Sequence, residues 1–308
     1  MEATFDPSAT ADLGRMIGQW DQGASCLAAL AVVAGSTPSG DATAEPLVNA
    51  ARNVVNAAGL AAVLASPHRL PFSPAQLRGM AASPLLQAAA LAGEQHAGWA
   101  ANNDATLIAQ GHASGSTAAL FTRFVLPHFS DLRDRLATPG SRMLDVGTGV
   151  GALAIGFAQA FPQLHVTGID VLPRAVAIAR DQAATSPAAS RVTIRQQDVA
   201  ELTDEACYDL AWIPAPFVPE PAFSAGVARI ATALAPGGIL MIGHGTSTGS
   251  DLQIAITQFK TALYGGTLLD GASAVKLLRR NGLTSARTMT TPPGAPAITV
   301  GQRQAQSQ

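Results

Sequence analysis

The pattern of hydrophobic and polar residues changes near the middle of the chain. Residues 9–115 are rich in alanine and poor in alternating β-branched positions, which favours helices over strands. The apolar positions predict helices at Ala9–Ala34 (with Gly23 as a point where it could break), Glu45–Leu64, Ser73–Ala82 and Pro84–Asn102. Ser36–Asp41 is expected to be a loop. We therefore expect residues 1–115 to form an all-α domain.

Short apolar runs alternate with helical stretches in the rest of the chain, residues 116–308. An amphipathic helix leads into them, since Phe121, Phe124, Leu132 and Leu136 recur at helical spacing, and Pro127 should kink it. Strands are expected at Met143–Val146, Leu164–Ile169, Arg191–Gln196, Tyr208–Ile213, Gly238–Gly243, Leu283–Met289 and Ala297–Gly301. This alternation is typical of an α/β fold with a doubly wound, mostly parallel sheet.

A glycine-rich turn follows the first of these strands. Gly147, Gly149 and Gly151 let the backbone fold tightly and approach a ligand, and a helix over Val150–Phe161 follows. Asp170 ends the second strand, where a carboxylate can accept both hydroxyls of a ribose. The stretch predicts a nucleoside-binding βαβ unit, although such glycines can also form only a tight turn.

Asp145 decides between two nucleoside ligands. The spacing of Gly147, Gly149 and Ala152 satisfies the relaxed G-x-G-x-x-G/A pattern of dinucleotide sites, which would suit NAD. A carboxylate two positions before the first glycine would repel a pyrophosphate by roughly 1 kcal/mol or more at ~4 Å. S-adenosylmethionine (SAM) has no phosphate and carries an ammonium group, so the same carboxylate would attract it.

The sequence around this turn resembles motifs I and II of class I SAM-dependent methyltransferases. Gln197-Asp198-Val199, Asp209–Pro214 and Leu234–Gly238 match later motifs of that family in order and spacing. The resemblance implies SAM as cofactor, S-adenosylhomocysteine as product, and a Rossmann-like seven-stranded sheet whose last strand is antiparallel. It implies a cofactor site formed by Asp145, Gly147, Thr148, Gly149, Gly151, Asp170, Val171, Asp198, Val199 and Pro214. Asp170 or Asp198 could instead be a helix N-cap.

Candidates for contact with a methyl acceptor lie on both sides of the glycine turn. Trp212 and Phe217 could form one wall of an acceptor pocket or could pack in the core. The loop after Trp212 faintly resembles the Asn-Pro-Pro-Tyr motif of amino- and nucleobase-directed enzymes, but it lacks the amide and the tyrosine. It also lacks the histidine of plant-type O-methyltransferases.

A catalytic base, if one is used, must therefore come from elsewhere. His112, expected in a polar glycine-flanked loop, is a candidate base or substrate contact, and His244 after the fifth expected strand is a second candidate base. Weaker candidates are His96, Glu220 and Tyr264. His165 is expected to be structural.

Composition excludes several classes of protein. The 308 residues carry a net charge of −2, with 48% apolar and 13% charged residues, so no basic surface points to nucleic acid. Cys26 and Cys207 are far apart and have no metal-site spacing, so neither a metal nor a disulfide is expected. Residues 1–12 lack a signal pattern, and Ala24–Gly35 is too short to span a bilayer, so no membrane association and a cytoplasmic location are expected.

The sequence thus predicts in-line transfer of the SAM methyl group to an oxygen of a small organic acceptor, with nitrogen or carbon less favoured. Resemblance to small-molecule O-methyltransferases with a helical N-terminal domain implies a homodimer through these helices. A helical cap on a monomer is the alternative. A non-catalytic SAM-binding protein and an NAD(P)-dependent oxidoreductase remain as alternative functions.

Overall fold

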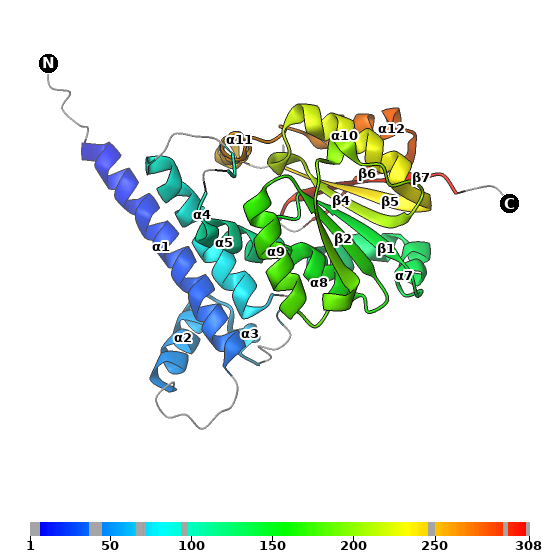
Figure 1. Ribbon diagram of the computed structural model, residues 1–308. Coiled ribbons are helices and arrows are strands. Elements are labelled where there is room, and N and C mark those ends of the chain that lie inside the picture. The colour runs from blue at the N-terminus through cyan, green and yellow to red at the C-terminus, as the bar shows by residue number, and fades with distance from the viewer. Residues whose placement is uncertain are drawn as a thin grey trace, which may run out of the picture.

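A computed structural model gives the architecture of the chain (Figure 1). It describes residues 7–36, 45–65, 70, 72–93, 98–100, 102–245, 250–291 and 295–305. The expected loop over Ser36–Asp41 (apart from Ser36), His96 and the end of the C-terminal tail lie outside the described residues. The helices before the sheet are α1 (Pro7–Gly35), α2 (Glu45–Ala57), α3 (Ala61–Ala65), α4 (Pro74–Gly93), α5 (Asp104–Ser114), α6 (Thr117–Leu120) and α7 (Ser130–Leu136).

A seven-stranded sheet forms the second half of the molecule. Its strands are β1 (Arg142–Val146), β2 (His165–Asp170), β3 (Val192–Gln196), β4 (Tyr208–Pro214), β5 (Leu234–His244), β6 (Leu283–Met289) and β7 (Ala297–Arg303). Their order across the sheet is β3-β2-β1-β4-β5-β7-β6. β1 to β5 are parallel, whereas β7 is antiparallel to both β5 and β6. The predicted doubly wound α/β sheet with an antiparallel last strand is confirmed.

Helices cover both faces of the sheet (Figure 1). On one face, α7 and α8 (Ala152–Ala160) bury Leu136 and Phe157 against β1, β4 and β5. On the other face, α10 (Glu220–Ala233) and α12 (Gly271–Arg280) bury Ile230 and Leu278. A further helix, α9 (Pro173–Thr185), packs beside β3. This arrangement leaves the carboxyl ends of the parallel strands open to a ligand.

The N-terminal helices differ in detail from the predicted ones. α1 continues unbroken through Gly23. The helix predicted over Glu45–Leu64 is interrupted at Gly59, whose φ of +75° does not belong to a right-handed helix. Pro84 lies inside the single helix α4 instead of starting a new one. A proline in a helix interior removes one backbone hydrogen bond, and packing of α4 against its neighbours compensates for this here.

The lead-in helix divides where the kink at Pro127 was predicted. After α6 the chain forms a π-helical turn, η2 (Phe121–Val125), and then a 3-10 turn, η3 (Leu126–His128), which contains Pro127. α7 follows after Phe129, so the predicted kink is a break between short helical segments. Three of the four predicted apolar positions, Phe121, Leu132 and Leu136, are buried in the core beside the sheet, whereas Phe124 is half-buried.

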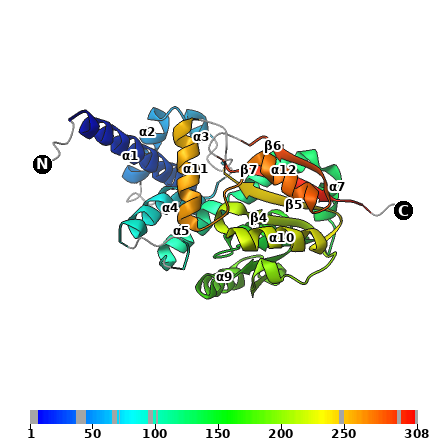
Figure 2. The same cartoon turned by 90° about the horizontal axis from the view of Figure 1, so that it is seen from above.

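Two of the helices that the sequence did not predict, α5 and α11 (Asp251–Tyr264), lie beside the strand ends. α5 replaces the polar loop expected around His112, and Asn103 caps it by accepting a hydrogen bond from the backbone N–H of Thr106. α11 begins with a capping box between Ser250 and Gln253. Figure 2 shows α11 lengthwise between the N-terminal helices and the sheet. Both helices thus lie between the two halves of the molecule.

Candidate cofactor and acceptor site

The glycine turn between β1 and α8 has the backbone that its sequence predicts. Gly147, Gly149 and Gly151 all have positive φ, at +66°, +55° and +81°. A Cβ atom on Gly151 would lie 3.2 Å from Cβ of Ala179, so this residue must be small as well as left-handed. A Cβ on Gly149 would meet no protein atom within 4 Å. The backbone of Gly149 therefore faces open space that a ligand can approach.

Asp170 fixes the glycine turn to the end of β2. One of its carboxylate oxygens accepts a hydrogen bond from the N–H of Gly149, and the other accepts from the N–H of Leu172, both at 2.9 Å. Burial raises the pKa of Asp170, and these N–H groups oppose the rise. Each oxygen keeps lone pairs for a further donor, such as a ribose hydroxyl.

Asp145 is a buried carboxyl group beneath the same turn. It is only 1% exposed, and the hydroxyl of Thr148 donates to its Oδ2 at 2.6 Å. Burial raises the pKa of Asp145 to about 7, and the nearby negative charge of Asp170 adds to the rise. A cation bound beside Asp145 would favour the ionised carboxylate.

Asp198 has the N-cap geometry that was considered as an alternative. Its side chain accepts a hydrogen bond from the N–H of Ala200 at 2.8 Å at the start of a 3-10 turn, η5 (Val199–Glu201). Asp198 also lines the cavity described next. Because a carboxylate has several acceptor positions, capping and ligand contact do not exclude each other.

A cavity of about 1320 Å³ lies between the strand ends and the helices α4, α5 and α11. Nine of the ten predicted cofactor residues line it, and only Gly151 does not. The carboxyl ends of β1, β2 and β4 contribute Val146, Asp170 and Pro214 to its wall. The structure therefore brings the cofactor residues to one side of one cavity, as expected for an open α/β sheet.

Three aromatic rings form another part of the cavity wall. Trp99 stacks on Tyr264 with ring centroids 5.0 Å apart, and Phe217 meets both rings edge-on at 5.5 and 4.8 Å. The N–H of Gly98 donates to the carbonyl oxygen of Leu263, which holds Trp99 beside the end of α11. We call Trp99, Phe217 and Tyr264 the aromatic trio.

Trp212 combines the two roles that the sequence left open. It lines the cavity, yet it is only 6% exposed and belongs to the core between the sheet and α8. Its indole lies over Gly243 of β5, where a Cβ would be 2.3 Å from the ring. A glycine at this position is thus required for the tryptophan to lie flat across the sheet.

Comparisons with known proteins match the segment that contains the glycine turn. The family described as Methyltransferase domain matches residues 143–238. The tRNA1(Val) (adenine(37)-N6)-methyltransferase of Porphyromonas gingivalis is 45% identical over 58 residues, which is 19% of this chain and 23% of that protein. The release factor glutamine methyltransferase of Deinococcus radiodurans is 56% identical over 45 residues, 15% of this chain and 16% of that protein. The chain thus spans less than a quarter of the length of these two curated relatives.

Solved structures match over almost the whole chain. Human N-acetylserotonin methyltransferase in complex with SAM aligns with a TM-score of 0.61 at 16% identity, covering 99% of this chain and 100% of that one. The pyocyanin biosynthetic protein PhzM (TM-score 0.62, 16% identity) and the mitomycin 7-O-methyltransferase MmcR (0.53, 19%) each cover 97% of this chain and 100% of theirs. At these identities the likeness shows a shared fold.

The match to the Methyltransferase domain family thus covers residues 143–238, and almost the whole chain shares its fold with the solved structures reported above. Among the residues that the structure describes, no group of three His, Cys, Asp or Glu side chains is arranged to hold a metal ion. Within the same residues, no helix combines the length and the apolar character that crossing a membrane requires.

One of the two candidate histidines is placed differently from expectation. His112 lies on α5 and not in a loop, and it is not among the lining residues. It packs at Gly79 of α4, where a Cβ would be 2.5 Å from Cβ of His112. Burial and the positive charge of Arg78 lower its pKa. His112 therefore faces the interface between α4 and α5 rather than the cavity.

His244 lines the cavity, but both of its ring nitrogens have partners. Nδ1 lies 2.8 Å from the carbonyl oxygen of Gly245, so it must donate, and Nε2 then accepts from the hydroxyl of Thr299 at 2.8 Å. Burial lowers the pKa of His244. The ring is thus neutral and held in place by hydrogen bonds.

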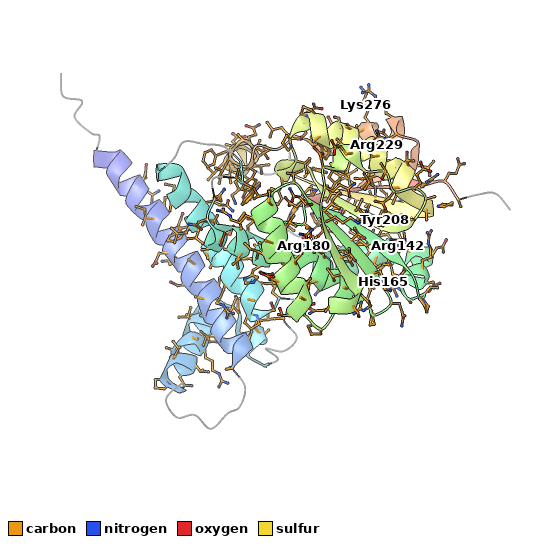
Figure 3. All side chains as sticks on the ribbon, in the orientation of Figure 1. Arg142, His165, Arg180, Tyr208, Arg229 and Lys276 are labelled. Atoms are coloured by element: carbon orange, nitrogen blue, oxygen red, sulfur yellow. The ribbon has the colours of Figure 1, made fainter. Side chains whose placement is uncertain are left out.

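The weaker base candidates that the structure describes are not suited to act as a base either. Glu220 is exposed, accepts from the hydroxyl of Ser224, and does not line the cavity. Burial raises the pKa of Tyr264 to about 12, so its hydroxyl stays protonated. His165 is exposed at the amino end of β2, away from the N-terminal helices (Figure 3).

Sequence reasoning missed a polar network in the helical wall of the cavity. It consists of Ser83 and Gln87 of α4, Gln110 and Ser114 of α5, and the hydroxyl of Tyr264 at the end of α11. All five residues line the cavity. The only sequence signal is the four-residue spacing of each polar pair within an alanine-rich helix, which places the two members on one face.

Proposed function

We propose that this protein transfers the methyl group of SAM to an oxygen of a small organic acceptor. One observation carries the proposal: the same cavity contains the predicted cofactor residues at the strand ends and an aromatic and polar wall opposite them. Its volume of about 1320 Å³ exceeds the upper range of ordinary ligand pockets, as a site for two ligands requires.

The residues at the strand ends fit SAM. Asp170 can accept ribose hydroxyls in addition to its backbone donors, and Asp145 can pair with the ammonium of the methionine moiety. The open face of Gly149 lets the ligand lie against the backbone. When bound, SAM supplies a methyl group already activated by its sulfonium. The chain then has to bind both partners, orient the acceptor oxygen and exclude water.

Orientation is the main contribution that these residues can make to catalysis. His244, the one histidine among the described lining residues, has both ring nitrogens engaged, and Tyr264 stays protonated. Holding two reactants in line can supply on the order of 7–11 kcal/mol at best. An acceptor oxygen that is acidic by itself, as in a phenol, a carboxylic acid or an enol, needs no strong base. His112 and His244 are not assigned as bases in this proposal.

Oxygen is favoured over nitrogen because of the segment after β4. The two curated relatives are named as an adenine-N6-methyltransferase and a glutamine methyltransferase. This chain has Pro214-Ala215-Pro216-Phe217, without the asparagine or the tyrosine of the nitrogen-directed motif. The three solved relatives reported above include an enzyme named as a 7-O-methyltransferase.

A titration of the purified protein with SAM, S-adenosylhomocysteine and NADH tests the cofactor. Binding of both sulfur nucleosides without NADH is expected, and binding of NADH alone would favour an oxidoreductase. Methyl transfer from labelled SAM to a panel of phenols and carboxylic acids tests the reaction. Tight SAM binding without turnover on any acceptor would favour the non-catalytic alternative.

We also propose that the protein is a homodimer through its N-terminal helices. Every described side chain from Arg15 to Gly23 of α1 is exposed, and three of these are large and apolar, namely Met16, Ile17 and Trp20. Large apolar residues grouped on one exposed segment mark an interaction site. Sedimentation equilibrium should give a dimer that Trp20→Glu dissociates, whereas Arg52→Glu on exposed α2 should leave it intact. A monomer at all concentrations would favour the helical cap.

A further inference from the structure

The polar network of Ser83, Gln87, Gln110, Ser114 and Tyr264 reaches the cavity surface with hydrogen-bond donors to spare. Gln87 Nε2 donates to Ser83 Oγ at 2.7 Å and to Gln110 Oε1 at 2.9 Å, and its Oε1 accepts from the Tyr264 hydroxyl at 2.8 Å. The Ser83 hydroxyl also donates to Gln110 Oε1 at 2.7 Å. Ser83 and Gln87, each 4% exposed, form the buried base of the network. Both lone pairs of Gln110 Oε1 are therefore engaged.

The outer end of the network, Gln110 and Ser114, has hydrogen-bond donors that are not used by any described residue. Gln110 Nε2 donates one hydrogen to Ser114 Oγ at 3.0 Å and has a second hydrogen without a partner among the described residues. The Ser114 hydroxyl hydrogen also has no acceptor in the described part of the chain. Both side chains are half-buried and line the cavity. Two neighbouring donors at a cavity wall can serve one accepting oxygen of a ligand.

The aromatic trio adjoins the polar network, because Tyr264 belongs to both, and Gln87 links the Tyr264 hydroxyl to Gln110. The Tyr264 ring stacks on Trp99, and its hydroxyl donates to Gln87. A flat ligand packed on the trio can therefore extend toward α5. The nearby cations, Arg123 and Lys260, line the same cavity but are exposed to solvent. A neutral oxygen suits the amide and hydroxyl donors better than a carboxylate, whose burial without a close cation is unfavourable.

We propose that Gln110 and Ser114 select acceptors that carry a carbonyl oxygen on a planar ring system. The carbonyl oxygen accepts hydrogen bonds from Gln110 Nε2 and Ser114 Oγ, while the ring packs on the aromatic trio. This inference rests on the proposed methyl transfer and specifies the acceptor for it.

Gln110 also lies next to a residue that packs against the glycine turn. The next residue, Gly111, lies so close to Val150 that a Cβ would be 2.2 Å from its Cγ2. α5 is thus held in contact with the glycine turn, so the two donors have a fixed position relative to the cofactor side. A rigid support of this kind is what a selective hydrogen bond needs.

The test uses three naphthols that differ only in one substituent on the ring remote from the hydroxyl: acetyl, ethyl or carboxyl. Each is titrated by calorimetry into the full-length protein saturated with S-adenosylhomocysteine. The acetyl compound should bind about tenfold more tightly than the ethyl compound, the size expected for one good hydrogen bond. Gln110→Leu should abolish this preference, and Ser114→Ala should reduce it several-fold.

Ser116→Ala is the matched control, because Ser116 also lines the cavity but its hydroxyl donates to the carbonyl oxygen of Ala113. It should keep the full preference. If Gln110→Leu does not fold, Ser114→Ala alone decides. Equal binding of the acetyl and ethyl compounds, no binding of either, tighter binding of the carboxyl compound, or a preference unchanged in the folded variants would each overturn the proposal. Failure of the proposed methyl transfer would be seen separately, as absent binding of S-adenosylhomocysteine or as no transfer from labelled SAM to a naphthol that binds.

Discussion

Replacing Asp145 by asparagine should stabilise the free protein while weakening its cofactor binding. The substitution keeps the shape of the side chain and its contact with Thr148, but it removes a buried charge that has no cationic partner among the described residues. Active sites commonly hold such groups at the expense of stability. Asp145→Asn therefore separates the effect of this carboxyl group on stability from its effect on cofactor binding.

The size of the effect follows from the pKa of Asp145. Burial raises this pKa from 3.8 to about 7. Between these two values the native state keeps a proton that the unfolded state has lost, so the stability of the wild-type protein falls as the pH rises through this window and then levels off. Relative to acid pH, where the side chain is protonated in both states, the titration of Asp145 lowers the free energy of unfolding by about 2 kcal/mol at about pH 5.5 and by about 4 kcal/mol at about pH 8. Asparagine does not titrate and escapes both losses.

Urea unfolding of wild-type and variant protein at the two pH values is the assay. The variant should be the more stable one, and its advantage should be about 2 kcal/mol greater at the higher pH. Comparing the two proteins at each pH cancels the titrating groups that do not interact with Asp145. Calorimetry should then show weaker SAM binding to the variant. A stability difference that does not change with pH, or a destabilised variant, would refute a pKa of Asp145 raised by burial.

Further substitutions test other parts of the site. Asp170→Ala should weaken SAM binding by about 2 kcal/mol in calorimetry, because charge-assisted hydrogen bonds are lost, and unchanged affinity would remove Asp170 from the site. Gly149→Val should abolish SAM binding without loss of the helical circular dichroism signal; normal turnover would mean that the backbone of Gly149 does not face the cofactor. His244→Ala should lower the free energy of unfolding by about 1–3 kcal/mol, since Thr299 loses a buried partner, and should leave the shape of the pH–rate profile unchanged. Loss of the acidic limb of that profile, in which a general base becomes protonated, would make His244 the base after all.

The sheet could be predicted from the sequence because its strands are short apolar runs set off by turns. β1 ends at Val146, directly before the three glycines, and its predicted and observed bounds differ by one residue. β5 is the largest departure: it begins at Leu234 rather than Gly238. The Pro236-Gly237-Gly238 turn suggested a later start, but Leu234 already pairs with Tyr208 across a register shift. Tertiary pairing extends a strand through residues that locally favour a turn.

The helical wall of the cavity could not be predicted in the same way. α5 contains glycine and serine, which weaken a helix in isolation. It forms because Asn103 caps it and because Gly79 and Gly111 allow close packing on α4 and on the glycine turn. The polar network depends on hydrogen bonds between residues as far apart in sequence as Gln87 and Tyr264. No local pattern records such a partnership.

The two ends of the cavity also differ in charge. This difference parallels the one between local and long-range sequence signals. The strand ends carry three carboxyl groups, Asp145, Asp170 and Asp198, all close to short sequence motifs. The helical wall presents neutral amides, hydroxyls and aromatic rings that only the fold assembles. Under the proposed function, a cationic cofactor is drawn to one end and a neutral, flat acceptor binds at the other. Because the acceptor end is assembled from several helices, its specificity can change through single substitutions in α4 or α5 without disturbing the motifs that hold the cofactor.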